Sequence, residues 1–282
     1  MALFNIGTSS FTASGWEGSF YPEGTKSTDF LRYYATRFNS VEIDSTFYGI
    51  PPMATVQGWA SKTPRDFVFA AKVPQIITHE KVLVDCDHEF KEFIAAMDCL
   101  GEKLGPMLFQ FGYFNRQAFF GVNDFLDRLR PFLKKLPSGH KFALEIRNKN
   151  WLVPQFIEAL REHNVALALI DQEWMPRPTE WFEKFDPITA DFTYVRWLGD
   201  RKGIEEKTKV WDKVIIDRHQ ELSEWAEVLG KVYKRRIQIF AYANNHYAGH
   251  SPATVEIFRD IWRRQVKEEP TRAGPSTLFP MR

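Results

Sequence analysis

The segment "KFALEIRNKNW", residues 141–151, decides how we interpret the fold. Its first half is an apolar run of the kind found in buried strands, but the run ends in two charged residues, Glu145 and Arg147. Successive side chains of a strand point to opposite faces, so these two lie on the same side of the chain. A gain in stability is a weak explanation for these two charges, because a buried ion pair often stabilises a fold no more than apolar residues of similar volume do.

Seven more strand-like runs occur in the chain. They cover residues 3–9, 40–44, 67–72, 106–111, 165–171, 192–199 and 237–245. Patterns typical of amphipathic helices separate most of them, at residues 27–38, 88–104, 122–136, 153–164 and 219–235, and another follows at 253–266. Strands that alternate with helices and are apolar on both faces predict a parallel sheet covered by helices.

The number of strands selects the architecture. Eight strand and helix units in about 250 residues predict a TIM-type (β/α)8 barrel, whereas a doubly wound α/β sheet would more often stop at five or six strands and carry a glycine-rich first turn. We expect one barrel domain over residues 1–266 and a loosely ordered tail over 267–282. The weakest unit is residues 172–190, where prolines interrupt the pattern and predict a long loop with one short helix.

Composition sets limits on the class of protein. The chain has 282 residues, 44% hydrophobic content and a net charge of +1, so it can bury a large core and carries no overall field that favours nucleic acid or an acidic membrane. It has no apolar run long enough to span a membrane and no signal-peptide pattern at its start. Cys86 and Cys99 fall in one predicted helix, too far apart to be bridged. We therefore predict a cytoplasmic protein without membrane partners.

Polar residues end every predicted strand. They are Ser9, Glu42, Asp44, Lys72, Gln110, Glu145, Arg147, Asp171, Arg196, Asn244 and Asn245. In TIM barrels the carboxyl ends of the strands form the catalytic face, while the interior is packed. We therefore expect these side chains to point into a solvent-filled cup at that end of the barrel.

The charges in this cup predict acid–base chemistry on an anionic ligand. Three cations, Lys72, Arg147 and Arg196, balance three anions, Glu42, Glu145 and Asp171, and such neighbours shift one another's pKa. We expect Arg147 and Arg196 to bind the anion, and Glu145, Glu42 and Lys72 to be catalytic. The alternative is that Glu145 and Arg147 only pair with their neighbours and hold the top of the barrel in register.

Other kinds of site have less support. His79, His246 and His250 follow strands, but no metal-ligand spacing surrounds them and three cations would repel a divalent ion, so we predict neither a metal nor a cofactor. No GxSxG motif indicates a nucleophilic serine. We expect most aromatic residues near the strand ends to pack against one another. Beside Lys and Arg they could also stack a sugar or a base.

The motifs resemble a known family. "GTSSFTASGWEGSFYP", "FNSVEIDSTFYGIPP", "LGPMLFQFGYF", "ALEIRNKNW", "YVRWLGDR" and "ANNHYAGHSPATV" occur in this order, and together with the segment around residues 59–79 they resemble the family called domain of unknown function 72, or YecE-like. The resemblance spans about residues 4–256 and implies a TIM-type barrel. It implies no established reaction; a nucleic-acid role has been suggested only by analogy with endonuclease-IV-type barrels, and fold does not imply function.

The resemblance also implies a set of polar positions. These map onto Glu42, Tyr48, Lys72, Thr78, His79, Gln110, Glu145, Arg147, Trp151, Arg196, Asn244 and Asn245. From this set we add Gln110, His79, Tyr48, Trp151, Asn244 and Asn245 to the predicted ligand-binding residues. Asp44 stands where many relatives carry Asn, and Leu198 where many carry His, so a mechanism that depends on that histidine would not hold here.

Three classes of function stay open at this point. The first is an enzyme, a hydrolase or a lyase, that acts on a small anionic ligand, for example one that contains phosphate. The second is a non-catalytic nucleic-acid-binding protein or an endonuclease-IV-like nuclease, and the third is a ligand sensor without chemistry. The sequence does not predict the oligomeric state.

Overall fold

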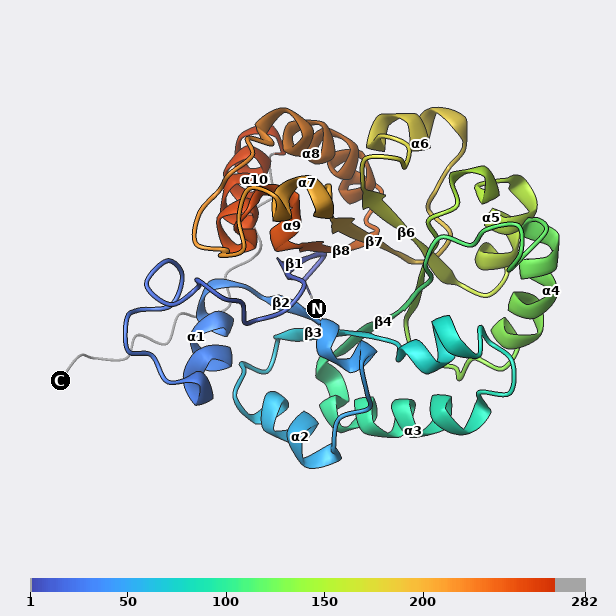
Figure 1. Ribbon diagram of the computed structural model, residues 1–282, viewed down its shortest axis with the longest axis horizontal. Helices are drawn as coiled ribbons and strands as arrows, with labels where there is room; N and C mark the ends of the chain where they lie inside the picture. The colour runs from blue at the N-terminus through green and yellow to red at the C-terminus, as the bar shows by residue number, and fades with distance from the viewer. Residues whose placement is uncertain (1, 267–282) are drawn as a thin grey trace.

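The computed structural model describes residues 2–266 and shows eight parallel strands in a nearly closed barrel surrounded by helices (Figure 1). The strands are β1 (Phe4–Thr8), β2 (Ser40–Ile43), β3 (Val68–Lys72), β4 (Leu104–Gln110), β5 (Phe142–Glu145), β6 (Val165–Asp171), β7 (Phe192–Trp197) and β8 (Gln238–Ala243). They are hydrogen-bonded in the order β1-β8-β7-β6-β5-β4-β3-β2. All eight predicted strands and the TIM-type barrel are confirmed. The predicted tail, 267–282, lies outside the described residues.

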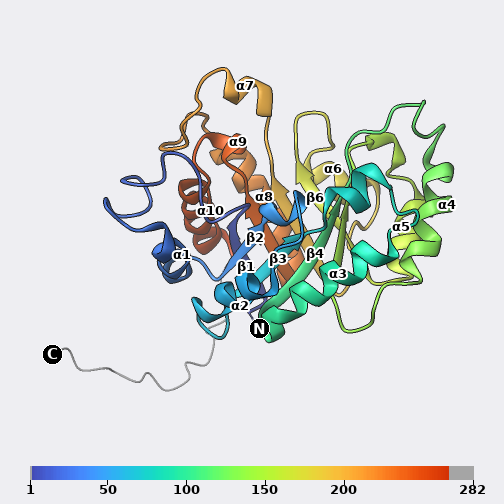
Figure 2. The ribbon, with the colours of Figure 1, turned by 60° about the horizontal axis from the view of Figure 1, so that its bottom comes forward.

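Helices form the outer layer of the barrel. They also form part of its rim at the carboxyl ends of the strands, which we call the upper rim. The outer helices are α1 (Phe30–Arg37), α2 (Met53–Ser61), α3 (Asp87–Met97), α4 (Val122–Leu133), α5 (Pro154–Arg161), α6 (Pro178–Lys184), α8 (His219–Lys234) and α10 (Ser251–Gln265). Two short helices, α7 (Arg201–Glu205) and α9 (Asn245–Ala248), lie at the end of the barrel opposite the N-terminus (Figure 2). That end carries the carboxyl ends of the strands and is the face seen in Figure 1.

The sequence pattern missed one outer helix and misjudged another. Helix α2 buries only Val56, so it lacks the apolar stripe that reveals an amphipathic helix. Helix α3 is shorter than predicted because it passes into a 3-10 segment, Asp98–Lys103, in which Gly101 adopts φ 56°. Cys86 and Cys99 therefore flank α3 rather than share it, and both are free. The single short helix expected within residues 172–190 is α6.

The seam between β1 and β2 is held by side chains. Asn39 accepts a hydrogen bond from the Ile6 amide at 2.9 Å and donates one to the Phe4 carbonyl at 2.9 Å. The hydroxyl of Tyr34 accepts from the Thr8 amide and donates to the Ser40 carbonyl. A Cβ atom at Gly7 would lie 1.8 Å from the Ser40 oxygen. Glycine therefore lets the two strands approach, while Asn39 and Tyr34 satisfy backbone groups at this edge.

Aromatic and polar side chains fill the interior beneath the upper rim. The rings of Tyr194 and Tyr242 lie 5.3 Å apart, and the Tyr242 hydroxyl is 2.7 Å from the Ser40 hydroxyl. Both tyrosines are fully buried. This packed layer lies in the barrel beneath the charged residues of the upper rim. Among residues 2–266 no helix has the length and apolar character needed to cross a bilayer.

Candidate active site

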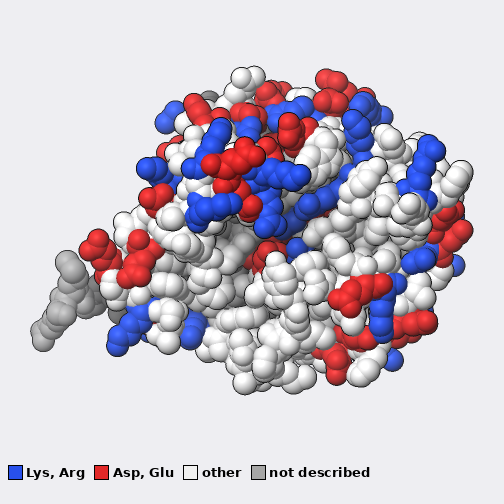
Figure 3. All heavy atoms as spheres, in the orientation of Figure 1, with Lys and Arg blue, Asp and Glu red and all other residues white. Residues whose placement is uncertain are grey.

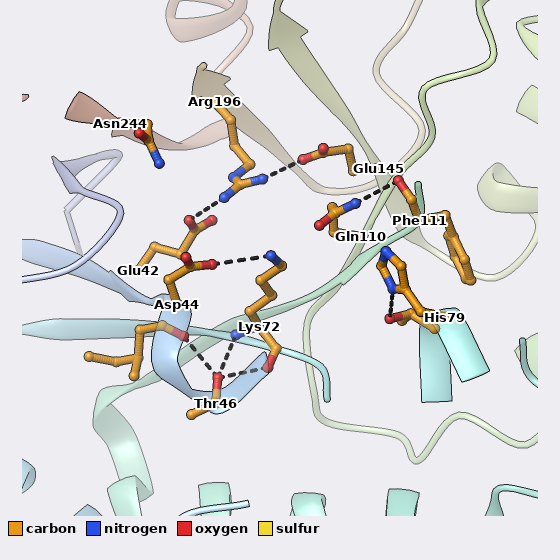
Figure 4. Close-up of polar contacts among 12 residues, drawn as sticks. Glu42, Asp44, Thr46, Lys72, His79, Gln110, Phe111, Glu145, Arg196 and Asn244 are labelled. Carbon is orange, nitrogen blue, oxygen red and sulfur yellow. Dashed lines mark hydrogen bonds and ion pairs between the residues drawn. The ribbon is translucent and has the colours of Figure 1, made fainter. Parts of the chain in front are cut away.

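Arg196 lies at the centre of the charged residues at the carboxyl ends of the strands (Figure 4). From the end of β7 its guanidinium donates to Glu42 Oε1 on β2 at 2.7 Å and to Glu145 Oε2 on β5 at 2.7 Å. The Arg196 side chain is 3% exposed, and neither glutamate side chain is exposed. We call Arg196, Glu42, Glu145 and Tyr194 the buried ion cluster, since the Tyr194 hydroxyl also donates to Glu42 Oε2 at 2.6 Å.

Each charge of this cluster is stabilised by the others. Burial acts to raise the pKa of Glu145, but the charges of Arg196 and Arg147 outweigh it and hold that pKa below its usual value. Burial acts to lower the pKa of Arg196, and Glu42 and Glu145 more than reverse this. The expected solvent-filled surroundings of Glu42 and Glu145 are therefore wrong: both carboxylates are enclosed and paired with Arg196.

Arg147 connects the buried ion cluster to the surface. It follows β5, and its Nε and Nη2 atoms lie 3.1 Å and 3.0 Å from Glu145 Oε1. Glu145 thus lies between two guanidinium groups, and its pairing with Arg147 is the structural alternative that the sequence left open. The Arg147 side chain is 25% exposed, so part of its donor fork faces solvent.

Lys72 occupies a second ion pair beside the cluster. At the end of β3 its Nζ lies 3.2 Å from Asp44 Oδ1 and 3.8 Å from the centroid of the Phe47 ring. The side chain is only 9% exposed. Burial lowers the pKa of Lys72, Asp44 partly offsets this, and the Arg196 charge lowers it further. Lys72 therefore releases its proton closer to neutral pH than an ordinary lysine does.

His79 completes the rim beside Lys72. It lies in the π-helical turn Ile76–Glu80 that follows β3, and its Nδ1 is 2.8 Å from the Thr78 hydroxyl. Its ring meets Phe47 edge to face at 5.0 Å. Burial lowers the pKa of His79, and the charges of Lys72 and Arg147 lower it further. The imidazole is therefore neutral at neutral pH, with two cations nearby.

Asp171 does not belong to the charged residues around Arg196. Its Oδ2 accepts hydrogen bonds from Trp225 Nε1 at 2.7 Å and from the Tyr247 hydroxyl at 2.9 Å, and its Oδ1 pairs with Arg177 at 3.2 Å. The prediction that Asp171 supplies the third anion is wrong, because the side chain contacts residues of α8 and α9 instead. Asp44 supplies that charge.

The remaining predicted ligand residues have several kinds of surroundings. Gln110 is buried and donates to the Phe111 carbonyl at 2.6 Å. Tyr48 is 73% exposed. Trp151 is buried and stacks on Phe114 and Phe125, and its place in ligand binding stays a prediction.

Asn244 and Asn245 stabilise local structure around α9. The side chain of Asn244 caps α9 by accepting from the His246 amide at 3.0 Å, and it contacts the His246 ring as well. Asn245 Oδ1 accepts from the Ser251 amide at 2.9 Å and from Trp16 Nε1 at 3.3 Å. These contacts leave their predicted role in ligand binding untested.

Sequence reasoning missed a groove beside the barrel mouth. It has a volume of about 760 Å³ and lies between the loop after β4, residues 113–122, and the segment after β5, residues 147–151, with Trp174 on one side. We call it the aromatic groove. The signal was present in "GYFNRQAFFG", residues 112–121, where four aromatic side chains and Arg116 occupy a loop. Within residues 2–266 no group of three or more His, Cys, Asp or Glu side chains is gathered in a way that could hold a metal ion.

Comparison with known proteins identifies the family. The family model described as "Protein of unknown function DUF72" matches residues 5–277. The chain belongs to the DUF72 family. The UPF0759 protein YunF of Bacillus subtilis is 28% identical over 84% of this chain and 88% of that protein. The UPF0759 protein YecE of Escherichia coli K12 is 34% identical over 126 residues, which is 45% of this chain and only 42% of YecE.

Solved structures of the DUF72 family share the fold. A DUF72 protein from Thermotoga maritima has a TM-score of 0.69 and 26% identity, covering 94% of this chain and 99% of that one. Another from Enterococcus faecalis has a TM-score of 0.65 and 22% identity, covering 92% of this chain and 97% of that one. The predicted resemblance is thus confirmed, and these relatives are named for their family rather than for a reaction.

Proposed function

We propose that this DUF72 protein is an enzyme that binds an anionic, phosphate-containing ligand at the mouth of its barrel. The observation that carries the proposal is the state of Lys72: a lysine that is 9% exposed, has a lowered pKa and is acted on by Asp44, Arg196, Glu145 and Glu42. Perturbed groups gathered from several strands at the carboxyl end of a barrel are typical of active sites.

Each charged residue then has a separate role. Arg147, with part of its guanidinium in solvent, receives the anion, because its planar fork matches a tetrahedral oxyanion. Lys72 exchanges a proton with the ligand, and neutral His79 is the second candidate for that step. Arg196 has both terminal nitrogens on carboxylates, so we now assign it to positioning Glu42 and Glu145 rather than to holding the ligand.

Glu145 takes part as an ionised carboxylate that positions Arg147. Its lowered pKa keeps it ionised, and it holds Arg147 in the orientation that presents the free part of the fork. The Glu42 carboxylate keeps Arg196 in place and, like that of Glu145, has no exposed surface. A cytoplasmic location and the division between hydrolase and lyase chemistry stay predictions.

The binding half of the proposal is tested by thermal shift with inorganic phosphate against chloride at equal ionic strength. A ligand at a hundred times its dissociation constant stabilises a protein by roughly 2.7 kcal/mol, which is easily detected. We expect Arg147→Gln to abolish the phosphate response, and Lys231→Gln, on the exposed face of α8, to keep it. An unchanged response in Arg147→Gln would overturn the assignment of the anion site.

The catalytic half requires a turnover assay. The protein is incubated with a pool of phosphorylated metabolites, and consumed and new compounds are identified by mass spectrometry. We expect a conversion that disappears in Lys72→Met while the variant remains folded by circular dichroism. Phosphate binding without any conversion would reduce the proposal to a ligand sensor, and a conversion that survives Lys72→Met would remove Lys72 from the mechanism.

Non-catalytic binding of nucleic acid is the second candidate. The aromatic groove favours it, since aromatic and basic side chains occur there together. Salt dependence separates the candidates: several phosphate contacts give a steep fall of affinity with salt concentration, and one anion site gives a shallow fall. A metal-dependent nuclease has less support, because the described residues gather no ligand cluster for an ion.

A further inference from the structure

Aromatic side chains in the groove are exposed to an unusual extent. Tyr113 is 69% exposed, Phe120 83% and Trp174 46%, and they are three of the four exposed aromatic side chains among residues 2–266. Scattered exposed aromatics are ordinary, but a group of them around one concave surface indicates a binding site. They come from two connections, the loop after β4 and the segment after β6, so the chain brings them together from separate regions.

The floor beneath these residues is built of packed aromatic rings. Trp151 stacks on Phe114 with ring centroids 5.7 Å apart and on Phe125 at 5.2 Å, and Phe119 meets both Phe125 and Trp151 edge to face. The backbone amide of Phe120 donates to Asp124 Oδ2 at 2.8 Å, at the start of α4. The floor of the groove is therefore packed in the absence of a ligand, and a ligand has only the exposed rings above it to order.

The charge of the groove has one sign. Arg116, Arg147 and Lys149 line it, and none of its lining residues within the described chain is acidic. Figure 3 agrees with this distribution: where Figure 1 shows the loops before α4 and α5, uncharged atoms predominate and Lys and Arg side chains lie among them. A neutral sugar would form no ion pair with the three cations, and the side chains of an acidic peptide would not stack on the exposed aromatic rings. An anion that carries a planar ring forms both kinds of contact.

We propose that the aromatic groove binds a nucleobase whose phosphate lies on Arg147. The base stacks on the exposed rings of Tyr113, Phe120 and Trp174, and Arg116 and Lys149 attract further phosphate charge. Arg147 belongs to both sites, because it lines the groove and pairs with Glu145 at the barrel mouth. The inference rests on the proposed function for its anion site, and it adds the class of ligand: a nucleotide unit, either free or at the end of a single strand.

The test uses three probes of graded chemistry on the full chain. Ribose 5-phosphate carries the phosphate without a base, adenosine monophosphate carries both, and a 5′-phosphorylated oligothymidine of eight nucleotides carries several of each. Binding is followed by quenching of tryptophan fluorescence and by anisotropy of a labelled strand. The variants are Tyr113→Ser and Phe120→Ser, and the control is Met53→Ser, which removes an exposed apolar side chain outside the groove.

We expect base-bearing probes to bind more tightly than ribose 5-phosphate, and each groove variant to weaken them by about tenfold or more. The groove variants should leave the affinity for ribose 5-phosphate unchanged, and Met53→Ser should leave the affinity for all three probes unchanged. A strand that binds no more tightly than the mononucleotide supports a free nucleotide as ligand, and tighter, strongly salt-dependent binding of the strand supports a nucleic-acid end.

Failures of the two proposals are distinguishable. If nucleotides bind no better than ribose 5-phosphate, or the groove variants leave nucleotide affinity unchanged, the base site is overturned while the anion site stands. If Arg147→Gln leaves the binding of all three probes unchanged, the anion site of the proposed function fails. Equal binding of polyglutamate that is insensitive to Phe120→Ser would show attraction by charge alone and would also overturn the base site.

Discussion

The buried ion cluster and the aromatic groove lie next to each other, but they differ in how far their side chains are exposed to solvent. In the cluster, Glu42 and Glu145 have no exposed surface and each is paired with Arg196. In the groove, Phe120 is 83% exposed. Charge at a barrel mouth is therefore weak evidence for a ligand when the charges satisfy one another. Exposed groups without an internal role are stronger evidence.

The largest effect should follow the loss of the central cation. Arg196→Met leaves two enclosed carboxylates without a counter-charge, and removing one partner of a buried pair typically costs about 3–5 kcal/mol. Urea unfolding measures this loss. The matched control is Arg65→Met, whose side chain is 89% exposed and pairs with Glu102 at the surface, so its unfolding midpoint should stay unchanged. Equal midpoints for the two variants would show that the cluster contributes no stability.

A smaller loss is expected from Glu145→Gln, which keeps the shape but removes the charge. Arg196 retains Glu42 in this variant, so we expect about 1.5–3 kcal/mol, the range for hydrogen bonds to charged groups. The folded pKa of Glu145 is lowered, so its contribution is present above the unfolded value of about 4.3 and is lost as pH falls through the lower folded value.

The pH series provides the control for that prediction. The difference in unfolding free energy between the natural chain and Glu145→Gln should be constant near neutral pH and shrink below about pH 4. A difference that does not change with acid, or a variant more stable than the natural chain at neutral pH, would show that Glu145 does not stabilise the fold by its charge.

The sequence predicted the barrel because strand pattern depends on local composition. Eight apolar runs were enough, and "VALALID" was located to the residue as β6. It also predicted that charges end the strands, since each lies directly after an apolar run. It could not predict partners: Asp171 ends its strand like the others but turns to Trp225 and Tyr247, and only the packing of α8 and α9 determines that.

The sequence also did not predict which charged side chains are buried or how the loop of residues 112–121 packs. The charges of Glu42 and Glu145 indicated solvent, whereas Arg196 and Tyr194 from β7 enclose and satisfy them. The aromatic groove depends on which rings of residues 112–121 pack under the loop and which do not. Phe119 is buried and its neighbour Phe120 is exposed, and composition alone does not distinguish them.

Arg147 should show an intermediate stability effect because it belongs to both regions. Its side chain is 25% exposed, and Glu145 keeps Arg196 when Arg147 is replaced. We therefore expect Arg147→Gln to lower the unfolding free energy by about 1 kcal/mol or less, in contrast to Arg196→Met. A loss as large as that of Arg196→Met would place Arg147 within the buried framework and would weaken its assignment to the anion site.

The smallest stability effect is expected at the groove, from the double variant with Tyr113→Ser and Phe120→Ser. Both rings are mostly in water in the folded protein, so their removal forfeits little buried apolar area, and surface changes of this kind usually stay within about 0.5 kcal/mol. The urea midpoint and slope measure it against Phe125→Ser, which removes a fully buried ring of the groove floor and should be strongly destabilising. If the double variant loses as much stability as Phe125→Ser, the exposed rings are part of the core and their exposure cannot be evidence for a ligand. A neutral double variant would instead mean that the fold does not need these two aromatic side chains, which leaves binding as the physical reason for their presence around one basic groove.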